Sequence, residues 1–316
     1  MKIVIPGGSG QVGTVLARAF HAEGQEVVVL SCRPDERAPW RVVPWDGQTA
    51  TGDWVGEIDG ADAVINLAGR SVNCRYTPEN RRAILDSRVH STRIIGEAVA
   101  RAASPPRVWL QAGTATIYAH RYDAPNDDVS GILGGGEPDL PETWRFSLDV
   151  ARQWEAALNE AQTPRTRKVI LRSAMVMSVD AGGVFDTLLG LARRGLGGPA
   201  GDGRQYVSWI HEHDFVRAVR LLLDRDDLAG PVAVAAPNPL PNAAFMRALR
   251  DAVGITFGLP ATAWMLEIGA WALNTETELI LKSRRVVPRR LLEVGFTFEY
   301  PDWPQAVQNL CHRWRE

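Results

Sequence analysis

The chain has 316 residues, 45% of them hydrophobic, and a formal net charge of −2 at pH 7. This length is enough for one large domain with a smaller appended lobe. A near-neutral charge without a long basic run argues against nucleic acid or an anionic membrane as the main partner, and three scattered cysteines exclude a disulfide framework or a zinc cluster.

Short apolar runs alternate with helix-length amphipathic segments through the first two thirds of the chain. Runs rich in Val, Ile and Leu predict strands at residues 2–5, 26–30, 62–67, 107–112 and 168–173. The intervening segments predict helices near residues 11–22, 78–101, 145–160 and 183–194. Because strands of this kind alternate with helices, the fold class we expect is α/β, a Rossmann-type doubly wound parallel sheet.

The character of the sequence changes after the last of these strands. Residues 193–203 are rich in glycine, and residues 237–242 form a proline-rich cluster. Residues 231–236 predict one more strand of the sheet. We therefore expect the chain to add this strand to the first domain before it continues into the C-terminal lobe.

These signals divide the chain into two parts. We predict a Rossmann-type domain over residues 1–236, with an insertion near residues 178–210 that belongs to the substrate lobe. Residues 237–316 predict a smaller, mainly helical lobe that covers the substrate. Within it, the alternating pattern of residues 295–301 predicts a short strand.

A glycine-rich turn separates the first predicted strand from the first helix. Glycines at this spacing allow a tight turn, close approach of the backbone to a pyrophosphate, and close packing of helix on strand. The helix N-terminus offers amide donors and a partial positive charge to phosphates. This context favours dinucleotide binding over a simple strand–helix turn. The predicted cofactor contacts in the turn are Gly7, Ser9, Gly10, Gln11, Val12 and Gly13.

The end of the second predicted strand selects the dinucleotide. An NAD site places a carboxylate there for the ribose hydroxyls, whereas an NADP site provides a cation for the 2′-phosphate. This chain reads Ser31, Cys32 and Arg33, with no acidic residue before Asp35. Arg33 can bind a phosphate through two N–H groups, although a solvated surface arginine is the simpler alternative. The pattern favours NADP(H) as the cofactor.

Three long motifs carry a family resemblance, at residues 65–89, 197–214 and 288–301. Together with the glycine turn and the "NLAG" stretch, they make the chain resemble an extended short-chain dehydrogenase/reductase. More narrowly, it resembles the atypical branch called epimerase family proteins, whose members carry a small C-terminal domain of unknown function. The resemblance implies a Rossmann-type domain, NADP binding, and a C-terminal lobe over the substrate cleft.

The resemblance also extends the predicted cofactor site. Small residues at the end of the third long strand let a ring or a ribose approach the backbone there. The further predicted contacts are Leu67, Ala68, Gly69, Arg88 and Val176. Relatives often have arginine where this chain has Cys32, so the predicted phosphate contact rests on Arg33.

The predicted catalytic residues lie in "GTATIYA", residues 113–119. This resembles the motif of sugar epimerases whose first hydroxyl binds the reacting oxygen, and Thr114 matches that hydroxyl. Ordinary members then carry a Tyr-x-x-x-Lys pair on the next helix. Here Ser147 and Ala151 occupy those positions, or Phe146 and Val150 if the alignment is shifted by one residue. Tyr118 is the first candidate to replace the lost tyrosine, and a packed aromatic is its alternative.

Three further residues are predicted to contact the substrate: Arg204, Trp209 and His211. His211 also suits proton transfer near neutral pH, although it could instead order the loop between the domains. Arg204 and Trp209 could equally serve interdomain packing. The "HEHD" stretch lacks a distant third ligand cluster, so no metal site is expected.

We therefore predict an NADP(H)-dependent oxidoreductase or epimerase. Its substrate is expected to be a small carbonyl, polyol or nucleotide-sugar-like compound. The alternative is an NADP-sensing binding or regulatory protein without rapid catalysis, which the missing pair favours. No apolar stretch is long enough to span a bilayer, and the chain begins with a strand instead of a signal peptide. We expect a cytoplasmic monomer or homodimer.

Overall fold

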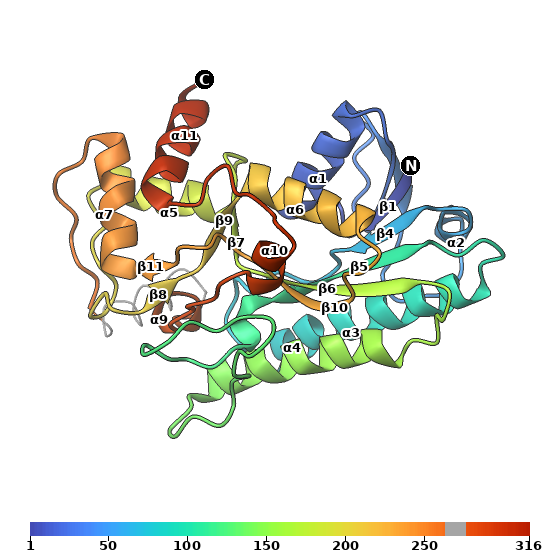
Figure 1. The fold of residues 1–316 in the computed structure, drawn as a ribbon, viewed down its shortest axis with the longest axis horizontal. Coiled ribbons are helices and arrows are strands. Elements are labelled where there is room, and N and C mark those ends of the chain that lie inside the picture. Colours follow the sequence, from blue (N-terminus) through green and yellow to red (C-terminus); the bar gives the residue numbers. More distant parts are fainter. Residues whose placement is uncertain (263–275) are drawn as a thin grey trace.

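A seven-stranded parallel sheet forms the centre of the molecule (Figure 1). The computed structural model describes residues 1–262 and 276–316. Across the sheet the strands run in the order β10-β6-β5-β4-β1-β2-β3. Their bounds are β1 (Lys2–Pro6), β2 (Glu26–Ser31), β3 (Arg41–Pro44), β4 (Ala63–Asn66), β5 (Val108–Thr114), β6 (Arg167–Ser173) and β10 (Gly230–Val234).

Helices cover both faces of this sheet, as Figure 1 shows. One face carries α1 (Gln11–Ala22) and α6 (Glu212–Asp224), and the other carries α3 (Pro78–Arg101) and α4 (Glu142–Glu160). The short helix α2 (Trp54–Ile58) packs beside α3, and the 3₁₀ turn η1 (Ala115–Ile117) follows β5. The predicted fold class, a doubly wound α/β sheet, is confirmed.

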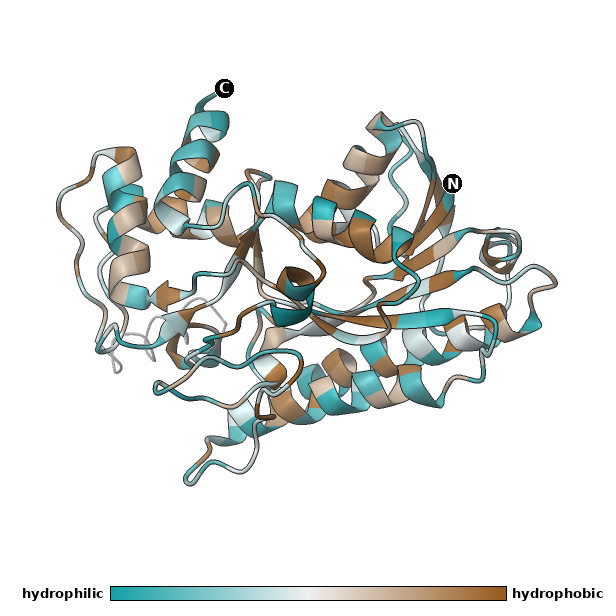
Figure 2. Cartoon of the chain, in the orientation of Figure 1, coloured by the Kyte–Doolittle hydropathy of each residue, from teal (hydrophilic) through white to brown (hydrophobic). Residues whose placement is uncertain are grey.

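The side chains of β1 explain why both faces must be covered. Ile3 and Ile5 are buried in one hydrophobic cluster with α1 and α6, while Val4 is buried in a second cluster with α3 and α4. Successive side chains of a strand point to opposite faces, so an uninterrupted apolar run needs an apolar partner on each side. Figure 2 accordingly shows hydrophobic colour concentrated on the central strands.

A second hydrophobic core lies beside the sheet. Three helices form most of it: α5 (Val184–Arg193), α7 (Asn242–Val253) and α11 (Trp303–Arg315). Two small pairs of strands complete it. In the first pair β7 (Met175–Met177) lies beside β9 (Trp209–His211), and in the second β8 (Tyr206–Val207) lies beside β11 (Leu240–Pro241). Two short helices, α9 (Glu278–Leu281) and α10 (Arg289–Glu293), lie between α7 and α11 in the chain.

Aromatic side chains hold this second core together. Trp303 stacks on Phe245 with ring centroids 4.1 Å apart, and it meets Trp209 edge-on at 5.0 Å. Segments before and after β10 therefore share one core, although a strand of the main sheet separates them in the sequence. The described part of the predicted 237–316 lobe is mainly helical, and residues 263–275 lie outside the described residues.

Two features of the second part of the chain differ from the sequence-based expectation. The strand predicted at residues 295–301 is wrong, because this segment is an extended connection that pairs with no other strand. Its backbone is instead bound by Asp214, whose carboxylate accepts hydrogen bonds of 2.8 Å from the N–H groups of Glu299 and Tyr300. Helix α6 was not anticipated, although its apolar positions recur at helical spacing.

None of the described helices combines the length and the apolar character needed to cross a membrane.

The Asp214 contact generates a stability prediction. Asp214 is fully buried and also forms a 2.8 Å ion pair with Arg217. We expect Asp214→Ala to leave two backbone donors and a cation without their partner, and to lower the free energy of unfolding by about 3 kcal/mol. Urea denaturation measures the change.

The exposed Asp224 at the end of the same helix provides the control. Asp224→Ala should change the free energy of unfolding by less than about 0.5 kcal/mol. Equal unfolding midpoints for the two variants would show that the Asp214 contact does not stabilise the fold.

Candidate functional site

The candidate site lies where the direction of the strand order reverses. Strand β1 pairs with β2 on one side and β4 on the other, so the chain proceeds outward in both directions from β1. All these strands are parallel, and their carboxyl ends lie along one edge. In open α/β sheets, ligands bind outside this edge at such a switch point.

Steric contacts explain the glycines of the first turn. Gly7 has a φ of +73°, and a Cβ atom on it would lie 2.6 Å from the Cα of Ala68. A Cβ atom on Gly13 would lie 2.4 Å from the Cα of Gly8. Because Gly7 and Gly13 have no side chain, the turn after β1 can lie directly against the end of β4, and helix α1 can pack directly against the same turn.

The N-terminus of α1 is available to an anion. Gly10 occupies the cap position, no side chain of the described residues caps the helix there, and its first turn contains no acidic residue. The backbone N–H groups at Gln11, Val12 and Gly13 belong to the first turn, which lacks intrahelical partners for them. The Gln11 side chain is engaged elsewhere, because its amide donates a 2.8 Å hydrogen bond to Ser178.

The end of β2 lies directly beside this turn. The Ser31 hydroxyl donates to the Ser9 hydroxyl at 2.8 Å and accepts from the backbone N–H of Arg33 at 3.0 Å. Cys32 and Arg33 are exposed. Two hydroxyls and the backbone of an exposed arginine therefore meet at the predicted ribose end of the site. The end of β2 has an arginine for a phosphate and lacks the carboxylate that would accept hydrogen bonds from ribose hydroxyls.

The end of β4 supplies the opposite wall. Ala68 is buried, and its N–H donates to the side chain of Asn66 at 3.0 Å. Gly69 lies against Arg88, whose guanidinium carbon is 3.1 Å from the position of an added Cβ. Leu67 is partly buried against the main core.

Arg88 is fixed in place from several sides. It donates to the carbonyl of Arg70 at 2.9 Å and lies over the Trp154 ring, 5.0 Å from its centroid. Burial lowers the pKa of Arg88 to about 10, which leaves it cationic at neutral pH. The site thus keeps a positive charge beside Gly69. Val176, by contrast, is a buried member of the main hydrophobic core.

Thr114 ends β5 on the same edge of the sheet. It is partly exposed, and its hydroxyl accepts a 3.1 Å hydrogen bond from the N–H of Thr116, the second residue of the turn η1. The hydroxyl keeps its own proton to donate to a bound oxygen. This position is compatible with the predicted contact to the reacting oxygen.

Tyr118 is placed differently. Its side chain is only 2% exposed, and its hydroxyl accepts a 3.2 Å hydrogen bond from Arg172, which forms a bidentate ion pair with Glu155. Burial raises the pKa of Tyr118, and the hydrogen bond from Arg172 opposes this only in part. The structure therefore argues against Tyr118 as a free general base and favours the packed-aromatic alternative.

The three predicted substrate residues do not come together. Trp209 is fully buried in the second core, and His211 is fully buried at the start of α6. Only Arg204 is exposed, and its guanidinium lies 5.7 Å from the ring centroid of Tyr122. The burial of Trp209 argues against direct contact with a substrate and favours the alternative, packing in the second core.

His211 is also engaged in contacts within the protein. One ring nitrogen accepts from the N–H of His213 at 3.1 Å and caps α6, and the other lies 3.1 Å from Asn309 on α11. Burial lowers the pKa of His211 to about 3, so the ring is neutral at physiological pH. A buried, capped imidazole with both nitrogens engaged argues against the predicted proton transfer or substrate contact and links α6 to α11 instead.

Residues that the sequence did not single out meet the candidate site from the C-terminal part. Lys282 and Glu278 are each 1% exposed, and they reach η1 and α4 respectively. Glu278 and Lys282 lie four residues apart in a segment rich in charged residues. Their partners lie more than 130 residues away, so local pattern could not have identified the contact.

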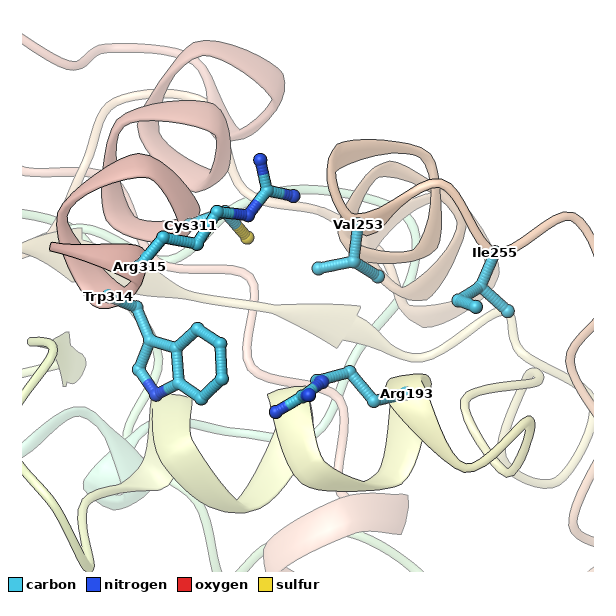
Figure 3. Close-up of a pocket in the computed structure, with 6 residues that line it drawn as sticks. All are labelled: Arg193, Val253, Ile255, Cys311, Trp314 and Arg315. Carbon is cyan, nitrogen blue, oxygen red and sulfur yellow. The ribbon is translucent and has the colours of Figure 1, made fainter.

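A separate pocket lies in the second core, away from the sheet edge. Figure 3 shows Arg193 of α5 facing Trp314 of α11, and the guanidinium carbon lies 4.5 Å from the ring centroid. None of the predicted site residues lines it. Within residues 1–262 and 276–316, no group of three or more His, Cys, Asp or Glu side chains is arranged to hold a metal ion.

Comparison with known proteins agrees with this architecture. Residues 3–235 match the NAD dependent epimerase/dehydratase family, and residues 261–310 match DUF1731, a domain of unknown function. The chain is 30% identical to the epimerase family protein SDR39U1 of Bos taurus, over 98% of this chain and 99% of that protein. It is 27% identical to the epimerase family protein SH2119 of Staphylococcus haemolyticus, over 98% of each.

Solved structures extend the likeness. The crystal structure of human epimerase family protein SDR39U1 (isoform 2) with NADPH has a TM-score of 0.84 and 27% identity, covering 99% of both chains. UDP-N-acetylglucosamine 4-epimerase from Bacillus cereus, at 15% identity and a TM-score of 0.75, shares the fold. The resemblance drawn from the sequence motifs is confirmed, and the chain belongs to the NAD dependent epimerase/dehydratase family.

Proposed function

We propose that this protein binds NADP(H) at the edge of the sheet and acts as an oxidoreductase or epimerase. The observation that carries the proposal is the uncapped N-terminus of α1, with Ser9, Ser31 and Arg33 beside it. Amide donors, hydroxyls and a cation suit the pyrophosphate and the 2′-phosphate of NADP. The NADPH in the crystal structure of the human relative supports the same choice.

Each part of the site has a role in this proposal. Bound nicotinamide would supply hydride transfer. Gly7 lets the first turn lie against Ala68, Gly69 lies against the cationic Arg88, and Thr114 donates its hydroxyl proton to the reacting oxygen. The substrate class that we propose is a small carbonyl or polyol compound, or a nucleotide sugar. The C-terminal lobe would cover it, with a monomer or homodimer as the assembly.

The second candidate is an NADP-sensing protein without rapid catalysis. It is favoured by Ser147 and Ala151 at the positions of the usual tyrosine and lysine, and by the engagement of Tyr118 with Arg172. The two candidates differ in turnover. A panel of 2,3-butanedione, 9,10-phenanthrenequinone and an aldose, followed at the absorbance of NADPH, tests for reduction. Epimerisation consumes no net NADPH, so UDP-glucose is tested by analysis of the sugar product. Turnover in either assay supports the first candidate, and turnover in neither supports the second.

The cofactor choice is tested by titrating the protein with NADPH and NADH while following tryptophan fluorescence. We expect NADPH to bind at least tenfold more tightly. Arg33→Ala should weaken NADPH binding about tenfold, because a charge-assisted contact with phosphate contributes about 1.5–3 kcal/mol, part of which an exposed site loses to solvent. NADH binding should be unchanged.

Arg37→Ala is the matched control, since Arg37 is an exposed arginine of the same loop and pairs with Asp35. It should leave both affinities unchanged. An unaltered preference for NADPH in the Arg33→Ala variant would contradict the assignment of the phosphate contact.

The role of Thr114 is tested with substitutions of its hydroxyl. Thr114→Val should lower turnover of a reactive carbonyl about 100-fold while NADPH affinity stays the same, because the lost donor acts mainly on the developing charge. Thr114→Ser keeps the hydroxyl and should retain most of the activity. Comparable turnover in the valine variant and the wild type would exclude Thr114 from the reaction.

A further inference from the structure

The C-terminal segment around α9 reaches the region where the usual catalytic pair is missing. The Lys282 ammonium donates a 2.8 Å hydrogen bond to the carbonyl of Thr116, and Arg284 donates to the Thr116 hydroxyl at 3.0 Å. Thr116 lies two residues after Thr114 in η1. The segment is therefore packed directly against the turn that carries the proposed oxygen-binding hydroxyl.

Glu278 makes the contact with helix α4. One carboxylate oxygen, Oε2, accepts a hydrogen bond from the hydroxyl of Ser147. The other, Oε1, is buried without a hydrogen-bond partner among the described residues, and the nearest Arg284 nitrogen is 4.0 Å away. Burial of an ionised carboxylate with one unpaired oxygen costs free energy, and this cost favours the protonated carboxyl.

The position of Ser147 makes this contact informative. Ser147 stands where relatives of the ordinary type carry tyrosine, but its side chain is much shorter than that of tyrosine. Glu278 reaches toward it from the C-terminal part, 131 residues further along the chain. Ser147 is partly exposed, whereas Glu278 is 1% exposed. The hydroxyl can thus meet a bound substrate, and the carboxylate behind it can exchange a proton with it.

The other titratable groups nearby are less suitable. Burial raises the pKa of Tyr76 to about 12, so its hydroxyl is a very weak base at neutral pH. Burial lowers the pKa of Lys282 to about 8, but its ammonium is directed at a backbone carbonyl. Glu278 differs from both, because its carboxylate already accepts a hydrogen bond from the Ser147 hydroxyl, and burial raises the pKa of this carboxyl.

We propose that Ser147 and Glu278 together replace the missing pair, with Ser147 in contact with the reacting oxygen and Glu278 as the proton reservoir behind it. This inference rests on the proposed oxidoreductase function. In oxidation, the substrate carbinol gives its hydride to NADP⁺ and its hydroxyl proton to Ser147 Oγ, while the Ser147 proton passes to Glu278 Oε2. The products are a carbonyl compound, NADPH and a protonated Glu278. Reduction reverses every transfer.

The charges around Glu278 determine the pH dependence. Lys282 and Arg284 lower its pKa, while Glu276 raises it, and Ser147 and Tyr76 complete the surroundings. Reduction needs the protonated carboxyl, so its rate should fall as pH rises through the pKa of Glu278. Oxidation needs the carboxylate, so its rate should rise over the same range. The rates of reduction and oxidation should therefore change with pH in opposite directions, and both changes should have the same midpoint.

The test uses the full chain with NADPH and the two diketone probes, 2,3-butanedione and 9,10-phenanthrenequinone, from pH 5 to pH 9. Glu278→Gln should lower kcat/KM at least 100-fold and remove the pH limb, because a general acid contributes about 10²- to 10⁴-fold. NADPH affinity, measured by tryptophan quenching, should stay within twofold of the wild type. Glu160→Gln, an exposed change at the end of α4, is the control.

Ser147→Ala provides a second route to the same question if Glu278→Gln does not fold. It removes only the hydroxyl, and it should also lower kcat/KM at least tenfold while leaving NADPH affinity unchanged. Ser147→Thr keeps a hydroxyl and should recover part of the rate. A purely structural role for the pair would change thermal stability and leave the pH limb in place.

Three outcomes would overturn the inference. A wild-type pH limb in Glu278→Gln would show that another group carries the proton. Loss of the limb in Lys282→Gln, with retention in Glu278→Gln, would assign that role to Lys282. NADPH binding without turnover of the diketones, the aldose or UDP-glucose would contradict the proposed oxidoreductase function, and the proposed role of Glu278 would then be wrong as well. Only the last of these outcomes bears on the proposed function itself.

Discussion

The approach of the first turn to the end of β4 is the contact on which the rest of the candidate site depends. A single Cβ atom at Gly7 would collide with the backbone of Ala68, and one at Gly13 would collide with Gly8. Without these contacts the helix α1 could not point its uncapped N-terminus at the switch point of the sheet. Steric contacts of the first 13 residues thus position the candidate site at the carboxyl edge of the sheet, beside β1 and β4.

The second constraint is the shared core beside the sheet. Trp209 and Phe185 precede β10, whereas Phe245 and Trp303 follow it, and all four are buried together. His211 and Asp214 add polar links from α6 to the C-terminal part of the chain. Because the second core is anchored in this way, the segment around Glu278 and Lys282 is held against η1 and α4. The proposed site is therefore built from both ends of the chain.

Sequence patterns were reliable where the physical cause is local. Helices 11–22 and 78–101 begin and end as predicted, since apolar spacing and terminal residues determine them. The patterns failed where a polar residue serves packing. Trp209 and His211 have the chemistry of ligand contacts, yet both are fully buried, and Asp214 holds residues 299–300 in place of a strand partner. Residue type alone does not reveal whether a polar group faces a cleft or caps a helix.

The sequence by itself determined the doubly wound sheet, the glycine turn and the absence of an acidic residue at the end of β2, because period, sterics and charge are properties of short segments. It also showed that the usual tyrosine and lysine are missing. Only the tertiary structure decided what stands in that region. Glu278 and Ser147 are separated by 131 residues, and their contact arises from the packing of two cores, which no local pattern encodes.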